Sequence, residues 1–118
     1  DWGLYGTRMS GFISALCHLP VHIIGLCLSA HRENKKTGEI KRVPAFNGQL
    51  SFDCPKYFDL VLSMESSVDT EGKPCRVWRT AATSECTAKD SSGVLAPMEV
   101  PNWTNVFVKI LSTKGNGK

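Results

Sequence analysis

An apolar run followed directly by a basic segment constrains this chain more than any other feature. Residues 21–28 read Val-His-Ile-Ile-Gly-Leu-Cys-Leu and follow Pro20. A short apolar run between turn signals predicts a strand that is buried on both faces. The next residues, 31–43, hold five Lys or Arg against two Glu, an excess equal to the formal net charge of +3 of the whole chain. The basic surplus is therefore predicted to lie in one mobile loop at the end of a central strand, where α/β proteins often bind ligands.

The segments around this strand predict a mixed α/β fold. Apolar residues in 4–19 recur at steps of three and four, which predicts a helix that ends at Pro20. Residues 57–64 alternate as a strand does, and 75–80 predict its antiparallel hairpin partner. A further short strand is expected within 83–89. A helix followed at once by a buried strand is half of a unit that builds parallel sheets.

The C-terminal part predicts one more helix. The apolar residues of 103–111 fit one helical face, and they follow Asn102, a good N-cap residue. Residues 91–93 are expected to form a turn, and residues 114–118 to form a frayed tail.

The size of the chain predicts a single domain, because 118 residues lie within the usual range of about 100–150. No apolar run approaches the roughly 18–20 residues that cross a bilayer, and Asp1-Trp2-Gly3 does not resemble a signal peptide. We therefore expect a cytoplasmic protein with no membrane partner. The chain begins at Asp1 without a Met, which leaves open whether it is a fragment.

Cysteine and histidine are numerous enough to raise a zinc site as an interpretation. The chain has five Cys and three His, with no Cys-x-x-Cys pair, and Pro20 interrupts any helical His-x-x-x-His face. Core thiols, among them Cys17 and Cys27, are the preferred interpretation, and an odd number of Cys favours reduced thiols over a disulfide framework. The zinc interpretation would use the following residues: Cys17, His18, His22, Cys27 and His31.

A phosphate-binding loop of the form Gly-x-x-x-x-Gly-Lys-Ser/Thr is not found in the sequence. The nearest stretch, Gly72-Lys73-Pro74, has Ser67 at the place of the first Gly and Pro74 at the place of the hydroxyl residue. The chain is therefore not expected to hold a nucleoside triphosphate by itself.

The basic segment allows two interpretations. It is either a solvated surface loop or a contact for an anionic ligand or nucleic acid, in which Lys and Arg displace counterions from phosphates. Aromatic residues are sparse in it, and Phe46 just beyond is the candidate for base stacking.

The order of short motifs resembles one known family. A helix ending Leu19-Pro20 precedes the strand His22-Ile23-Ile24, a charged loop, the stretch 57–61 and a hairpin, and Ala88-Lys89-Asp90-Ser91-Ser92-Gly93 follows. This order resembles the C-terminal half of phage RecA-like P-loop ATPases, the AAA-type phage nucleotide-binding group that includes single-strand-annealing recombination proteins. The resemblance implies a RecA-like core, with parallel strands continued by an antiparallel hairpin and flanked by helices.

The resemblance also implies functional residues. The loop at 31–43 corresponds to a DNA-facing loop, and Lys89 to the first basic residue of a stretch that reaches the triphosphate of a neighbouring subunit, although Ser91 stands where the next Arg is expected. Ser29 corresponds to a polar γ-phosphate sensor at the strand end. ATP and Mg²⁺ would bind to Walker motifs expected upstream of Asp1. The implied contacts to single-stranded DNA are Arg32, Lys35, Lys36, Lys41 and Arg42.

These features predict part of an ATP-dependent protein of phage recombination, in a bacterial or phage-infected cell. The parent would assemble head to tail as a homo-oligomer and bind single-stranded DNA, while this chain alone would be inactive as an ATPase. The alternative prediction is a small non-enzymatic α/β module that binds nucleic acid or protein, for which the missing phosphate-binding loop is natural.

Overall fold

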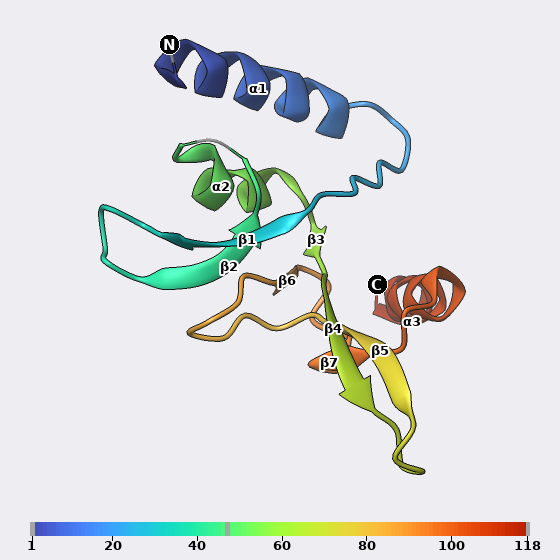
Figure 1. Ribbon diagram of the computed structural model, residues 1–118. Coiled ribbons are helices and arrows are strands. Elements are labelled where there is room, and N and C mark those ends of the chain that lie inside the picture. Colours follow the sequence, from blue (N-terminus) through green and yellow to red (C-terminus); the bar gives the residue numbers. More distant parts are fainter. Residues whose placement is uncertain (1, 47, 118) are drawn as a thin grey trace. The chain divides into compact units, whose positions relative to one another are not determined.

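The computed structural model describes residues 2–46 and 48–117, and the side chains of residues 3–46 and 48–112. The chain divides into two compact units, one formed by residues 1–58 with 84–86 and one formed by residues 59–83 with 87–118. Within the described residues, three α-helices and antiparallel ladders make a mixed α/β fold (Figure 1). The coarse fold class expected from the sequence is therefore confirmed.

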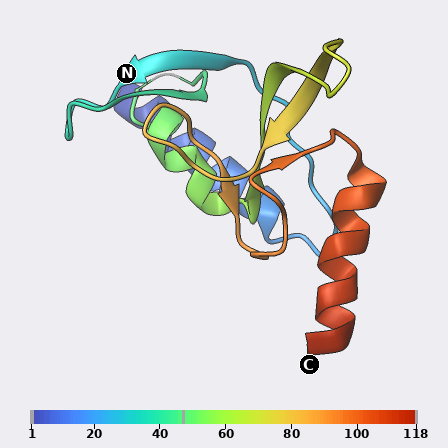
Figure 2. The same cartoon turned by 90° about the horizontal axis from the view of Figure 1, so that it is seen from below.

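The first unit is built on helix α1, Trp2–Cys17, which confirms the helix predicted at 4–19. Its buried residue Ile13 packs with Leu50 and Cys54, which belong to the short helix α2, Leu50–Asp53, and to the 3₁₀ turn η1, Cys54–Tyr57. Figures 1 and 2 both show α1 lying alongside this α2 segment. The apolar face of α1 thus covers α2 and η1.

The strand predicted at 21–28 is not formed, and this prediction was wrong. Residues 22–28 have no regular secondary structure, and the side chains of Leu26 and Leu28 are 95% and 83% exposed. An apolar run becomes a buried strand only when neighbouring strands pair with its backbone and cover its side chains. No strand among the described residues pairs with this run, so it forms no ladder and most of its side chains stay exposed.

Regular pairing begins where the loop was expected. Strand β1, Ser29–Glu33, pairs with strand β2, Ile40–Pro44, in an antiparallel hairpin. The expectation of a mobile loop at 31–43 was therefore wrong. Segment 84–86 lies along the other edge of β2, since the Arg42 N–H donates to the Glu85 carbonyl at 2.9 Å and Arg42 bridges Cys86 in parallel register.

The second unit contains an antiparallel hairpin, as predicted, but its first strand lies later in the chain than the predicted 57–64, while its second strand overlaps the predicted 75–80. Strand β4, Ser63–Val68, pairs with β5, Pro74–Arg79, and the edge of β5 pairs with β7, Met98–Glu99. Strand β3, Leu60–Val61, pairs with β6, Lys89–Asp90. The further strand expected at 83–89 is absent, because Cys86 makes only an isolated bridge and pairing resumes at Lys89.

Helix α3, Trp103–Gly117, confirms the predicted C-terminal helix. The Asn102 side chain accepts the Asn105 N–H at 3.2 Å, which is the expected N-cap. The helix continues through Gly117 instead of ending near Leu111, and Lys118 lies outside the described residues. Val106 is fully buried on α3, and Trp103 packs on Trp78 of β5, so the helix covers the β4–β5–β7 sheet within this unit.

Candidate nucleic-acid interface

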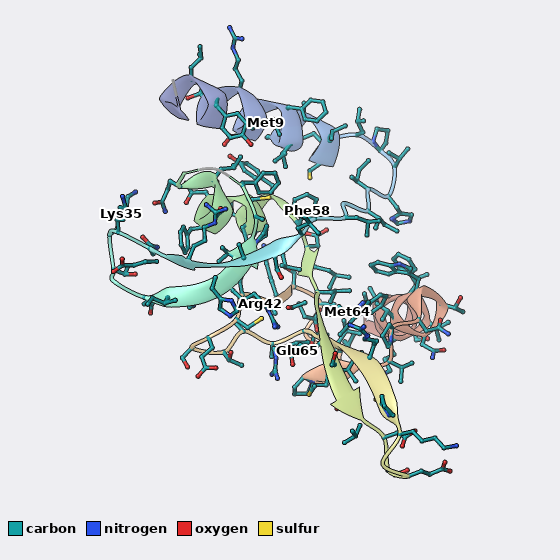
Figure 3. All side chains as sticks on the ribbon, in the orientation of Figure 1. Met9, Lys35, Arg42, Phe58, Met64 and Glu65 are labelled. Atoms are coloured by element: carbon teal, nitrogen blue, oxygen red, sulfur yellow. The ribbon has the colours of Figure 1, made fainter. Side chains whose placement is uncertain are left out.

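The tip of the β1–β2 hairpin is an ordered turn. The Asn34 side-chain oxygen accepts the Lys36 N–H at 3.0 Å, and the Asn34 N–H donates to the Glu39 carbonyl at 2.8 Å. Gly38 adopts a positive φ of 78°, a conformation that costs any residue with a Cβ. Lys35 and Lys36 are therefore presented at a defined place, and Figure 3 shows Lys35 at the hairpin tip.

The hairpin register sorts the basic side chains by face. Directly paired residues project to the same face, and successive pairs alternate between faces. Arg32 pairs with Lys41, and His31 pairs with Arg42. The sequence placed these cations together in one loop, whereas the strands direct Arg42 to the face opposite to Arg32 and Lys41.

The cations toward the tip are available to a ligand. Lys35 and Lys36 are exposed, Arg32 is half-buried, and none of them forms an ion pair within the described part of the chain. Lys41 approaches Glu39 at 4.0 Å, a distance at which an exposed pair contributes little stability. A phosphate could displace such a contact at small cost.

Arg42 is engaged inside the first unit. Its Nη2 donates to the Cys86 Sγ at 3.2 Å, and its backbone N–H bonds the same segment through Glu85. Figure 3 shows Arg42 nearer the hairpin base than Lys35. Of the five predicted DNA contacts, Arg42 is thus the one with a visible structural role.

Ser29 and Phe46 are two further residues for which the sequence suggested a functional role. Ser29 is the first residue of β1, exposed and paired with Pro44. Phe46, the candidate for base stacking, packs against the core of Ile13, Leu50 and Cys54. Its ring is half-buried there, and stacking of a base on Phe46 stays a prediction.

Lys89 belongs to the second unit, so Ser29 and Lys89 lie in different units. It pairs with Val61 in the β3–β6 ladder and is half-buried. Together with Thr80, Asp90 and Gly93 it lines a pocket of about 320 Å³. The Lys89 ammonium makes no ion pair with a described carboxylate, so it could receive an anionic group.

Asp90 shapes the loop beside Lys89, a role that the sequence argument missed. Its carboxylate accepts the N–H groups of Ser92 at 2.9 Å and Leu95 at 3.0 Å, together with the Ser92 hydroxyl. Burial raises the pKa of Asp90, but these hydrogen bonds and one from the Gly93 N–H outweigh burial, so its pKa lies below the ordinary value. The signal in the sequence was Asp-Ser-Ser-Gly, a pattern typical of an Asx turn.

In residues 2–46 and 48–117, no group of three or more His, Cys, Asp or Glu is placed to hold a metal ion. All five cysteines are free thiols. Both Cys17 and Cys27 were expected in the core. Cys17 packs against the cluster of Ile13, Leu50 and Cys54, whereas Cys27 is exposed. No helix in the described part of the chain has the length and apolar character needed to cross a membrane.

Comparison of the chain with protein-family models, with curated proteins and with solved structures finds no match. The RecA-like resemblance of the sequence therefore stays a prediction.

Proposed function

We propose that this chain is the C-terminal half of an ATP-dependent phage DNA recombination or annealing protein, and that the β1–β2 hairpin binds single-stranded DNA. The observation that carries the proposal is the ordered hairpin itself. It concentrates the basic surplus of the chain on two short strands and a turn, with Lys35 and Lys36 exposed at the tip. Such a surface releases counterions from a phosphate backbone without base readout, as sequence-tolerant binders do.

The RecA-like fold of the parent protein is part of this proposal. Residues 22–28 are apolar, have no regular secondary structure and are mostly exposed, and they lead directly into β1. A strand of a larger parallel sheet has this composition, since both of its faces would be covered. The β4–β5 hairpin would then be the antiparallel continuation that follows such a core.

The nucleotide chemistry would come from the parent protein. ATP and Mg²⁺ would be held by its Walker motifs, and a bound Mg–ATP supplies the transferable phosphoryl group. Lys89 would place its ammonium against the triphosphate of a neighbouring subunit in a head-to-tail homo-oligomer, where a cation stabilises developing negative charge. Ser29 would be the polar residue nearest the end of the 22–28 segment.

Binding of fluorescein-labelled oligo(dT) to the 118-residue chain, followed by anisotropy across a salt series, tests the proposal. The wild type should bind, and its affinity should fall steeply as salt rises. Neutralising Lys35, Lys36, Lys41 and Arg42 together should weaken binding and flatten the salt dependence. Unchanged binding by that variant would remove the hairpin from the DNA interface, and measurable ATP hydrolysis by the chain alone would overturn the half-enzyme assignment.

The small binding module is the competing function, and the lack of a Gly-rich phosphate loop in the sequence favours it. The reading frame upstream of Asp1 separates the two. A strand followed by a Gly-rich loop ending in Lys-Ser/Thr supports the ATPase, whereas a start codon at that place supports the module.

A further inference from the structure

The five cations of the hairpin differ in what surrounds them. Arg32 and Lys41 are directly opposite each other in the ladder, so their side chains leave the same face. Arg42 is one residue further along β2 and leaves the other face, where its guanidinium bonds Cys86. A single strand of DNA that follows one face of the hairpin could not contact all five.

The basic residues of the hairpin continue beyond this ladder. Lys35 and Lys36 lie in the turn that follows β1, and both are exposed. The two cations of the ladder and the two lysines of the turn make up the basic surface of the hairpin apart from Arg42. We call Arg32, Lys35, Lys36 and Lys41 the hairpin strip.

Arg42 joins strand β2 to a segment that is distant in the sequence. Its backbone N–H and its guanidinium both bond residues of 84–86, which lie 43 or 44 positions later. Cys86 is buried and its sulfur is a weak acceptor, so the side-chain bond acts together with the backbone bond to place Arg42 against this segment. Loss of the Arg42 side chain would remove the bond to Cys86, leave the backbone bond to Glu85, and keep all four cations of the hairpin strip.

We infer that the DNA backbone follows the hairpin strip and that Arg42 is a positioning residue that makes no phosphate contact. This inference rests on the proposed function, because it assumes that the hairpin binds single-stranded DNA. It assigns the contact to one face and divides the basic residues into four that neutralise phosphates and one that holds the hairpin in place.

The salt dependence of oligo(dT) binding separates the two roles, because its slope counts phosphates neutralised and not structural order. Each lost contact should make the slope of log K against log salt shallower by about 0.7. The slope measured for R32Q/K41Q should therefore be shallower than the wild-type slope by about 1.4. R42Q should bind more weakly with an unchanged slope, and C86A, which removes the acceptor of Arg42 without any change of charge, should do the same.

A matched control accounts for net charge. K56Q/K73Q removes two lysines outside the hairpin, so it lowers the formal net charge from +3 to +1 as R32Q/K41Q does. Its slope should equal that of the wild type. Far-UV circular dichroism of each variant verifies the fold, and C86A still tests the role of Arg42 if R42Q fails to fold.

The outcomes distinguish this inference from the proposed function. A wild-type chain that does not bind oligo(dT) overturns the proposed function and the inference with it. A wild type that binds, combined with a slope about 0.7 shallower in R42Q or an unchanged slope in R32Q/K41Q, overturns the division of roles alone.

Discussion

The indole of Trp78 packs on the indole of Trp103, with ring centroids 4.7 Å apart and ring planes tilted by 50°. Trp78 lies on β5 and is buried, while Trp103 is the first residue of α3 and stacks in turn with Phe107 at 5.7 Å. Tilted aromatic pairs add specific attraction to the apolar area they remove from water. This contact joins the start of the helix to the sheet within the second unit.

Replacing Trp103 with Ala should destabilise the second unit by about 3 kcal/mol, because the substitution leaves a cavity against Trp78. Urea unfolding followed by far-UV circular dichroism measures the loss. V108A provides the control, since Val108 is exposed on the same helix. Equal stability of W103A and V108A would show that the aromatic contact does not hold α3.

Glu99 should make the second unit sensitive to acid. The Lys109 ammonium bonds both carboxylate oxygens, at 2.8 and 2.7 Å, and the Ala96 N–H donates at 2.7 Å. The hydrogen bond from Lys109 is the main cause that lowers the pKa of Glu99 below 4.5, against the raising effect of burial. A carboxyl whose pKa is lower in the folded state stabilises the fold above its unfolded pKa and loses that contribution as the pH falls through the folded value.

The free energy of unfolding of the wild type should therefore fall as the pH drops below about 4.5. E99Q should lack the part of this fall that Glu99 causes. Urea unfolding at a series of pH values tests the difference between the two proteins. E71Q, which removes an exposed carboxylate from the β4–β5 turn, should lose stability at low pH as the wild type does. Parallel pH profiles for wild type and E99Q would contradict the role given to Glu99.

The Glu65–Arg79 pair should show a measurable coupling energy. Arg79 donates two hydrogen bonds to the carboxylate, at 2.7 and 3.1 Å, and both side chains are half-buried. A bidentate, charge-assisted pair in this setting is expected to couple by about 1–2 kcal/mol. A double-mutant cycle with E65Q and R79Q measures it.

The control for that cycle is the exposed pair of Lys73 and Glu71, at 3.4 Å. An exposed pair of this kind should give no coupling above the experimental error. R79K should fail to restore the first pair, because an ammonium cannot reproduce the planar fork of the guanidinium. Equal coupling in the two cycles would argue against the bidentate geometry.

Gly38 should be required for the order of the hairpin tip. With φ at 78°, an Ala at this position would cost about 1 kcal/mol although no atom lies within 4 Å of its added Cβ. Hydrogen–deuterium exchange of the 29–44 peptide should be faster in G38A and partly restored in G38N, since Asn tolerates this conformation. G25A is the matched control, with a Cβ in open space and no positive φ. Equal exchange in G38A and G25A would contradict the requirement.

Local signals in the sequence predicted much of the second unit. Helix α3 followed from its periodicity and from Asn102, and the β4–β5 hairpin followed from a turn in which Asp69 accepts the N–H groups of Glu71 and Lys73. These features are determined by residues a few positions apart. Their physical causes can be read from the chain without knowledge of its tertiary contacts.

The first unit was harder to predict because its decisive contacts are distant in the sequence. The apolar composition of 21–28 suggested a strand, but pairing and burial depend on neighbours that composition does not reveal. The β1–β2 hairpin was missed because its charge suggested a solvated loop, although Asn34 and Gly38 are turn residues. The candidate site stays a prediction, and the separate placement of Arg42 depends on Cys86, 44 residues later.

The uncovered 22–28 segment has a practical consequence for the isolated chain. It contains no Pro and no Lys, Arg, Asp or Glu, and Leu26 is almost fully solvent-exposed. Short uncharged apolar segments of this kind template cross-β association. Purified chain should therefore aggregate more as its concentration rises, and L26K should keep it dispersed with no loss of core packing.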